Sequence, residues 1–368
     1  MSSYMGNKNS NIGFIGNLGD KNIIGGQITK TRDLFAAILA RKGVEKGVIN
    51  NFLENGIGNS CFNQEGLYIA DFKSNNILKL MLQVFKIFNN CQNIILILAS
   101  FTYLRILPFV LLLNRIYKRN LYEFVIGGVR HEYLKQNDIN NEKYIKKIFV
   151  ESTYMKDCYE KLGLNNVVYM PNFKHVKPIN SEEINMRDDK VLRCCTYSRV
   201  DPYKGIDDAI KIIKRFGENT DHITLDIIGP VDRNFDFQFN TLLENKPATI
   251  KYFGVIDGNN SSKILKDYDV LLCPTKWKAE GFPGSFIDSM QAGLVILATD
   301  KPNFRDIIIN DENGWLLAEN DIDGYLEKLR ILDSNKNLLR KMQKKALSDS
   351  MKYDTDIVLK NFLDELME

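Results

Sequence analysis

Two basic residues lie in a turn-like segment near the middle of the chain. The segment SRVDPYKG (residues 198–205) directly follows the apolar run 191–197 and precedes an amphipathic stretch that starts at Ile206. This order predicts a strand, a turn and a helix, so Arg199 and Lys204 can converge on one point beyond the end of the strand. A planar guanidinium beside a mobile ammonium suits the adjacent anionic groups of a diphosphate. The Arg-x4-Lys spacing alone is equally compatible with surface salt bridges.

A second segment carries two carboxylates and a loop rich in glycine. The segment EGFPGSFIDSMQAG (residues 280–293) places Glu280 and Asp288 eight residues apart, after the apolar run 269–273. Its glycines and proline predict an open loop, followed by a helix whose N-terminus attracts anions through free backbone N–H groups and the helix dipole. Glu280 alone can be a solvated loop acid, and Asp288 alone can serve the helix dipole. The whole pattern favours a ligand site.

A pair of glycines precedes the first predicted helix. Gly25 and Gly26 follow a predicted strand over residues 11–16 and a loop over residues 17–24. Glycines at this position let the backbone approach a phosphate at the N-terminus of a helix. A plain junction between loop and helix explains the pair equally well.

Short apolar runs alternate with amphipathic stretches along most of the chain, which predicts parallel sheets with right-handed crossovers. Strands are expected over 11–16, 93–99, 121–126, 148–151, 166–170, 191–197, 223–228, 249–253, 269–273 and 294–298. Helices are expected over 27–41, 101–119, 153–162, 206–216, 262–268 and 284–292, with further helix from 321 to 368. The fold class is therefore α/β, with two Rossmann-like βαβ domains facing a cleft, because ligands bind beyond the carboxyl ends of such strands.

A polar connector over residues 174–190 divides these elements into two series. We expect an N-terminal Rossmann-like domain over residues 1–175 and a C-terminal Rossmann-like domain over residues 176–350. The last stretch, residues 351–368, is expected to form a helix that can pack back on the N-terminal domain.

Composition excludes several classes of protein. The 368 residues are 44% hydrophobic and 26% charged, as in an ordinary globular protein, and the formal net charge of +3 predicts no binding of nucleic acid. The six cysteines contain no C-x-x-C pair and the three histidines are far apart, so we expect no metal site. The polar start predicts no signal peptide, and the longest apolar run, residues 106–113, is too short to cross a bilayer. A cytoplasmic protein is expected.

The apolar and basic stretch over residues 104–119 has two interpretations. It can be a core helix with a solvated basic end, or a helix whose exposed side touches anionic lipid headgroups on the inner face of the membrane. The sequence leaves both open.

Taken together, these motifs resemble the retaining GT-B glycosyltransferases of family four, which transfer a sugar from a nucleotide diphosphate. Residues 198–205 look like the diphosphate-binding pair of that family, and residues 280–288 look like its E-x7-E motif. The segment NGWLL (residues 313–317) lies where the family keeps an Asn-Gly turn, and VYMPN (residues 168–172) resembles the exit from its first domain. The resemblance covers nearly the whole chain.

The resemblance implies a role for each candidate residue. Arg199 and Lys204 would stabilise the departing diphosphate, and Glu280 would accept hydrogen bonds from hydroxyls of the donor sugar. Asp288 would hold the ribose hydroxyls. The remaining donor contacts would come from the first domain at the glycine pair, from the segment flanking the base and from the amides of the 280-loop; these residues are Gly25, Gly26, Ile256, Phe282, Pro283, Gly284 and Ser285. The resemblance also implies that the N-terminal domain binds the acceptor and the C-terminal domain binds the nucleotide sugar. The family needs no cofactor and is generally independent of metal ions.

The chain departs from the family pattern at two positions. The second acid of the motif is Asp288 in place of glutamate, so its carboxylate reaches one methylene less and the contact with ribose can run through water. The family often has a histidine after a strand of the first domain, and His131 is the candidate here, with a plain surface histidine as the alternative.

The sequence thus predicts a retaining, metal-independent glycosyltransferase of the hexosyltransferase type. Its donor would be a nucleotide sugar with uridine as the commoner base, and its acceptor a glycan or lipid-linked saccharide of cell-surface polysaccharide synthesis. Two alternatives are a nucleotide-sugar epimerase and a non-catalytic subunit that binds sugar nucleotides.

Overall fold

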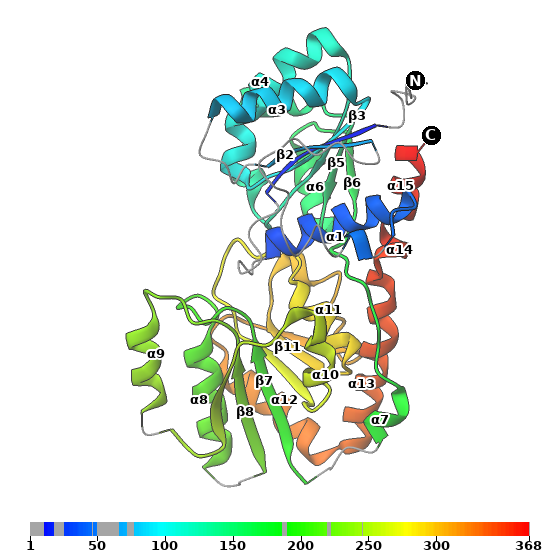
Figure 1. Cartoon of the computed structure of the whole chain (residues 1–368). Helices are drawn as coiled ribbons and strands as arrows, with labels where there is room; N and C mark the ends of the chain where they lie inside the picture. Colours follow the sequence, from blue (N-terminus) through cyan, green and yellow to red (C-terminus); the bar gives the residue numbers. More distant parts are fainter. Residues whose placement is uncertain are drawn as a thin grey trace. The chain divides into compact units, whose positions relative to one another are not determined.

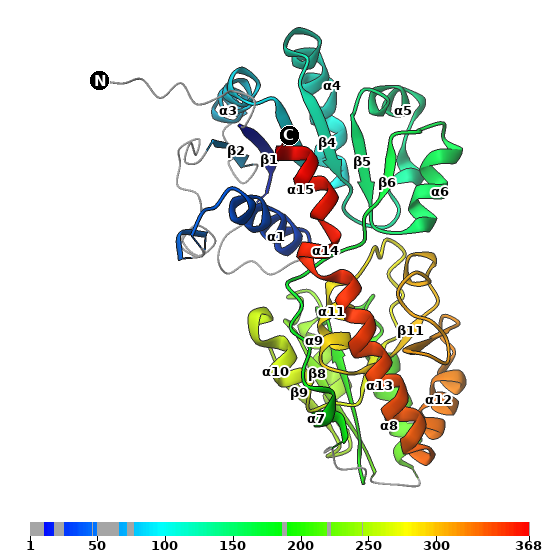
Figure 2. The same cartoon turned by 90° about the vertical axis from the view of Figure 1, so that its right-hand side faces the viewer.

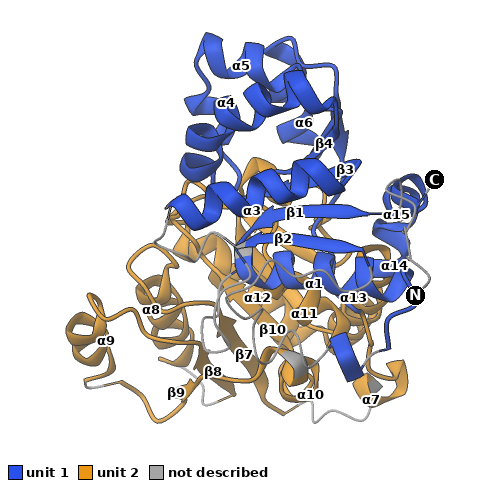
Figure 3. Ribbon diagram, turned by 45° about the horizontal axis from the view of Figure 1, so that its top comes forward, with its two compact units in different colours: residues 1–175, 355–368 blue, residues 176–354 orange. Residues whose placement is uncertain are grey.

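The computed structural model describes residues 11–17, 26–45, 47–49, 66–71, 77–185, 190–218, 222–244 and 246–367. The chain forms two compact units, coloured separately in Figure 3. Unit 1 comprises residues 1–175 and 355–368, and unit 2 comprises residues 176–354. The chain therefore passes from one unit to the other twice, once after His175 and once after Asp354.

Unit 1 is built on a sheet of six parallel strands in the order β2-β1-β3-β4-β5-β6 (Figure 1). The strands are β1 (Ile12–Gly16), β2 (Leu67–Asp71), β3 (Asn93–Ile97), β4 (Asn120–Phe124), β5 (Lys147–Val150) and β6 (Val167–Tyr169). All five residues of β3 are buried, as expected of a parallel strand that is covered on both faces. Because the strands are parallel, their carboxyl ends share one edge of the sheet.

Helices cover both faces of this sheet. They are α1 (Gly26–Arg41), α3 (Ile77–Asn90), α4 (Ser100–Tyr117), η2 (Arg130–Tyr133), α5 (Gln136–Glu142), α6 (Thr153–Lys161), α14 (Thr355–Val358) and α15 (Lys360–Met367). One core packs α3, α4 and α6 on the sheet, and the other packs α1 and α15 on the opposite face (Figure 2). Phe362 of α15 lies against the rings of Phe149 and Phe124, at centroid distances of 4.9 and 5.2 Å.

Unit 2 repeats this plan with the strand order β12-β11-β10-β7-β8-β9, again all parallel. The strands are β7 (Leu192–Tyr197), β8 (Ile223–Ile228), β9 (Ile250–Gly254), β10 (Val270–Cys273), β11 (Val295–Thr299) and β12 (Gly314–Leu317). The helices are α7 (Ser181–Asn185), α8 (Ile206–Gly217), α9 (Asp236–Leu243), η3 (Gly258–Asn260), α10 (Ser261–Leu265), α11 (Gly284–Gln291), η4 (Pro302–Phe304), α12 (Ile322–Ser334), α13 (Lys336–Ser350) and η5 (Met351–Tyr353).

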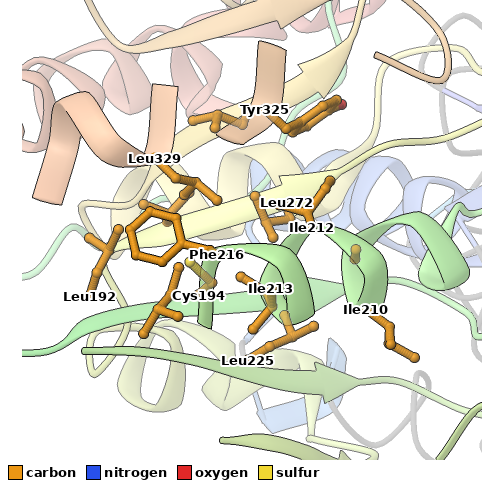
Figure 4. Packing of buried hydrophobic residues seen from close by; sticks show 14 of the residues in the cluster. Leu192, Cys194, Ile210, Ile212, Ile213, Phe216, Leu225, Leu272, Tyr325 and Leu329 are labelled. Carbon is orange, nitrogen blue, oxygen red and sulfur yellow. The ribbon is translucent and has the colours of Figure 1, made fainter. Parts of the chain in front are cut away.

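Two apolar clusters fix the helices of unit 2 that carry the candidate site. Ile213 and Phe216 of α8 pack in one cluster with Leu225 of β8, as Figure 4 shows. In the other cluster, Phe286 and Met290 of α11 are completely buried. Both helices are thus held on the sheet, and the loops at their N-termini start from fixed points.

The structure differs from the predicted elements in several places. Strands β2 and β12 and helices α3 and α9 were not predicted. In the segment 313–317, Asn313 ends a turn over residues 311–313, and Gly314 begins strand β12. The predicted helix 101–119 ends at Tyr117, because Lys118 adopts a left-handed conformation. The helical tail breaks at Asn335, whose side chain accepts a hydrogen bond from the amide of Leu338 and caps α13.

Candidate functional site

Lys204 and Glu280, which the sequence places 76 residues apart, form an ion pair in unit 2. The Lys204 Nζ atom donates to Glu280 Oε1, and the side chains are 21% and 13% exposed. Lys204 lies in the loop after β7 and Glu280 in the loop after β10, so both extend from the carboxyl edge of the sheet. An ammonium that can bind phosphate thus lies beside a carboxylate that can accept hydrogen bonds from sugar hydroxyls.

Hydrogen bonds and a second ion pair hold the two loops together. The amide of Lys276 donates to the carbonyl of Tyr203 at 2.7 Å, and Thr275 Oγ1 donates to the same carbonyl at 3.2 Å. Lys276 Nζ also lies 2.8 Å from Asp208 Oδ2 in the first turn of α8. The loop that carries Glu280 is therefore fastened to both the loop and the helix next to Lys204.

Two glycines let neighbouring loops at this edge of the sheet approach one another closely, backbone against backbone. Gly205 has φ +69°, and a Cβ atom there would lie 1.9 Å from the carbonyl oxygen of Pro274. Gly229, after β8, has φ +141°, and a Cβ atom would lie 1.8 Å from the carbonyl oxygen of Ser198. No other residue fits either position without moving the backbone. Sequence analysis missed Gly229, although the Gly-Pro pair directly after β8 is a signal for it.

Arg199 is exposed and forms no ion pair with any described residue. Its neighbours are nevertheless fixed, because the amide of Ser198 donates to the carbonyl of Ile228 at 3.1 Å and Val200 forms a bridge with Val231. The structure therefore places Arg199 in the same loop as Lys204 with its guanidinium in solvent. That both cations converge on one diphosphate stays a prediction.

The loop after Glu280 leads into the N-terminus of α11. Asn303 Nδ2 donates to the carbonyl of Glu280 at 2.7 Å, which fixes the start of the loop. The side chain of Phe282 is buried against Tyr353, at a centroid distance of 4.9 Å, so its backbone alone can reach a ligand. Pro283 is the N-cap and has no N–H group, which leaves Gly284 and Ser285 to supply the first amides of the helix.

Asp288 is 2% exposed and lies inside unit 2. Its Oδ1 accepts a hydrogen bond from Gln291 Nε2 at 3.3 Å. Burial raises the pKa of the neighbouring Tyr197 phenol, and the negative charge of Asp288 raises it further. The Asp288 carboxylate therefore already has a partner within the unit. Its predicted contact with ribose hydroxyls stays a prediction.

The segment predicted to flank the base exposes a different side chain from the one expected. Ile256 is 7% exposed and belongs to the apolar core of unit 2. Val255 is 54% exposed and follows Gly254, which has φ +95° and ends β9. The accessible apolar side chain in this segment is therefore Val255, and Ile256 can contribute through its backbone.

In unit 1, Gly25 lies outside the described residues. Gly26 is the first residue of α1 and is exposed, and a Cβ atom there would meet nothing within 4 Å. Packing within the described part of the chain therefore does not require glycine at position 26.

His131 lies in η2 and is half-buried between aromatic rings. Its ring centroid is 5.6 Å from that of Tyr154 and 6.2 Å from that of Tyr159. The Nδ1 atom is buried and has no hydrogen-bond partner among the described residues. Burial lowers the pKa of His131, so the imidazole is neutral at pH 7.

The residue before His131 belongs to a buried cluster that sequence analysis missed. The guanidinium of Arg130 donates to both oxygens of Glu123, to Glu142 Oε1 at 3.0 Å and to the Tyr159 hydroxyl at 2.8 Å. It also lies 4.4 Å from the ring centroid of Tyr103. Burial raises the pKa of Glu142 to about 8, and Glu123 adds to the shift. The cluster anchors η2 on the sheet and so fixes the backbone of His131.

The described residues contain no group of three or more His, Cys, Asp or Glu side chains placed to hold a metal ion. Among these residues, no helix has the length and apolar character that a membrane span requires.

Comparisons of sequence relate the chain to known transferases. Residues 177–349 match the family described as Glycosyl transferases group 1. A Campylobacter jejuni N,N'-diacetylbacillosaminyl-diphospho-undecaprenol alpha-1,3-N-acetylgalactosaminyltransferase is 22% identical over 256 residues, which cover 67% of this chain and 65% of that protein. The Escherichia coli putative colanic acid biosynthesis glycosyltransferase WcaL is 25% identical over 146 residues, which cover 38% and 35%. The chain thus spans two thirds or less of these relatives.

Solved structures share the fold over nearly the whole chain. Anabaena Alr3699/HepE in complex with UDP superposes with a TM-score of 0.73 and 15% identity, covering 97% of this chain and 99% of that one. The lipopolysaccharide outer core galactosyltransferase WaaB gives 0.65 and 14%, covering 96% and 98%. The two parallel six-stranded sheets of this chain thus form the GT-B fold of these structures, and residues 177–349 carry the similarity to the glycosyl transferases group 1 family.

Proposed function

We propose that this protein is a retaining glycosyltransferase that moves a sugar from a UDP-sugar to a hydroxyl of a glycan or lipid-linked acceptor in cell-surface polysaccharide synthesis. The single observation that carries the proposal is the Lys204–Glu280 pair at the carboxyl edge of the unit 2 sheet. The HepE complexes with UDP and with UDP-glucose support uridine as the base. The diphospho-undecaprenol acceptor named for the Campylobacter protein supports a lipid-linked acceptor.

Unit 2 would supply most of the electrostatic stabilisation. As the bond between the anomeric carbon and the diphosphate breaks, negative charge grows on the leaving oxygen, where Lys204 and Arg199 would bind it. The amides of Gly284 and Ser285, at the N-terminus of α11, would add a fixed dipole, since the first turn of α11 has no acidic residue. Groups fixed in place before the reaction stabilise the transition state without the cost of reorganisation.

Glu280 would orient the donor sugar through hydrogen bonds to its hydroxyls. Its carboxylate is held by Lys204, and its carbonyl by Asn303. The acceptor oxygen would attack from the face that the diphosphate leaves, and the proton of the acceptor would pass to the departing diphosphate oxygen. A reaction that follows these steps retains the anomeric configuration and needs no protein nucleophile. With Arg199 and Lys204 in the place of a metal ion, we propose that the reaction is metal-independent.

The test compares Lys204→Ala and Arg199→Ala with Lys344→Ala at saturating donor. Lys344 of α13 lies on the same unit, is exposed and forms no ion pair with any described residue, so its loss changes the net charge equally without touching the site. Loss of a leaving-group contact lowers kcat by ~10²–10³-fold. A fall of less than about tenfold for both site variants would exclude this role. Incubation with donor alone separates the proposal from an epimerase, which would form a new nucleotide sugar without acceptor.

A further inference from the structure

Helix α3 exposes an apolar stripe although its other face is already buried in the core. Leu78 and Leu82 are 71% and 58% exposed, and Met81 and Phe85 are each 37% exposed. The spacing i, i+3, i+4, i+7 puts these side chains on one face of the helix. The inward face is separate and consists of Val84, Ile87 and Phe88, which are buried against the sheet. Packing among the described residues of unit 1 therefore does not account for the outward stripe.

Helix α4 exposes a second set of apolar side chains, mixed with cations. Leu112 and Ile116 are 57% and 74% exposed, and Arg105 and Arg115 are exposed along the same side. The opposite side of this helix is in the core, as the first interpretation of residues 104–119 expects, and contact with lipid stays a prediction. The outward side of α4 carries apolar side chains as well as charged ones, and no other element of the described chain covers it.

Helices α3 and α4 lie against each other beside these outward faces. Phe85 of α3 lies edge-on against Phe109 of α4, at a centroid distance of 6.1 Å. One turn further along α3, the carbonyl of Phe88 accepts a hydrogen bond from Arg119 Nε at 2.9 Å. Both helices cover the same face of the unit 1 sheet (Figure 2). We define the α3–α4 surface by its exposed apolar side chains, which are Leu78, Met81, Leu82, Phe85, Leu112 and Ile116.

The charged residues of α3 and α4 are all basic. Between Asp71 and Glu123 the sequence contains no acidic residue, but it contains the cations Lys73, Lys79, Lys86, Arg105, Arg115, Lys118 and Arg119. Lys86, Arg105, Arg115 and Lys118 are exposed and form no ion pair with any described residue. This concentration is local, since the whole chain has a net charge of only +3.

We propose that the α3–α4 surface binds the face of an anionic lipid bilayer. Its apolar side chains would enter the boundary between headgroups and acyl chains, and its cations would meet the lipid phosphates, as in other interfacial helices. Charge complementarity selects this partner, because a protein surface of mixed charge would leave many of these cations unmatched. The proposal goes beyond transfer of the sugar and does not rest on it.

The experiment measures co-sedimentation of the full-length protein with two kinds of vesicle, phosphatidylglycerol mixed with phosphatidylcholine and phosphatidylcholine alone. We expect binding to the anionic vesicles, weakened when salt rises from about 0.1 M to about 1 M and the screening length falls from ~10 to ~3 Å. Each of Lys86→Gln and Arg115→Gln should lower the partition coefficient about fivefold. Lys344→Gln, an exposed lysine of α13, is the matched control and should have no effect.

The apolar contribution is tested with Leu82→Glu and Ile116→Glu. Both side chains are exposed, so the fold should tolerate the change, which circular dichroism verifies. Each should lower binding to anionic vesicles by about tenfold or more, whereas Phe237→Glu, which changes an 81% exposed side chain of α9 in unit 2, should not. Equal binding to neutral vesicles, or an equal loss with Phe237→Glu, would overturn the proposal. So would absence of lipid binding together with a dimer that Leu82→Glu dissociates.

Discussion

Gly205 joins the two loops that carry Lys204 and Glu280, and its replacement by alanine gives a sharp test of the site. Its backbone has φ +69°, where a side chain costs ~1–2 kcal/mol. The added Cβ would also lie 1.9 Å from the carbonyl oxygen of Pro274, far inside van der Waals contact. Backbone has to move to relieve such overpacking, at ~1–3 kcal/mol. We therefore expect Gly205→Ala to lower the free energy of unfolding by about 3 kcal/mol.

The assay is thermal unfolding, followed by circular dichroism, together with donor turnover. For a unit of this size about 3 kcal/mol corresponds to a fall of about 6–12 °C in Tm. Gly217→Ala, at the other end of α8, is the matched control, because Gly217 has no positive φ and a Cβ there would meet nothing within 4 Å. That change should leave Tm the same or raise it slightly. A Gly205→Ala variant that melts within about 2 °C of the parent would refute the packing argument.

Three further predictions follow from other contacts. Glu142 has a pKa raised to about 8 in the fold against 4.5 for the free side chain, so the folded state binds the extra proton between these values. Its contribution to stability is complete below pH 4.5 and is lost as the pH rises through 8, and Glu142→Gln should flatten this part of a Tm–pH profile. For the ion pair, Lys204→Ala and Glu280→Ala should be non-additive in kcat, because the two side chains touch; additive effects would show that they act separately. Phe362→Ala should destabilise unit 1 by ~3–5 kcal/mol in chemical unfolding, and a loss under about 1 kcal/mol would show that α15 does not brace the sheet.

The sequence predicts the parallel α/β architecture well because buried parallel strands are continuous apolar runs. Residues 93–97 are such a run, and so are residues 295–299. Strand β12 lacks that signal, because it is short and begins at a glycine. Helix α3 has a clear helical periodicity, with the polar residues Lys79, Gln83 and Lys86 at i, i+4 and i+7, and sequence analysis missed it. The helix breaks at Asn335 because its side chain caps α13 by accepting a hydrogen bond from a backbone amide. The residues on both sides are good helix formers, so the sequence alone favours a continuous helix.

The candidate site shows the same limit at the level of single side chains. Motif spacing identified Lys204 and Glu280, but their contact depends on Gly205, Pro274 and Thr275, which bring two distant loops together. Spacing also cannot tell which side chain of a short segment is exposed. Ile256 was expected to be accessible, but the structure buries it and exposes Val255. Such contacts are set by tertiary packing, which no local pattern encodes.

Arg130 is a charged residue buried inside unit 1, and its partners explain how the fold tolerates its charge. One guanidinium faces two carboxylates, Glu123 and Glu142, so full ionisation of both would leave an uncompensated buried charge. The raised pKa of Glu142 resolves this conflict, because its carboxyl is neutral at pH 7 and Arg130 pairs with Glu123. The result is a nearly neutral anchor that fixes Arg130 directly before His131. A hydrophobic side chain at position 130 could fill the same space, but it could not set the direction of η2 through several hydrogen bonds at once.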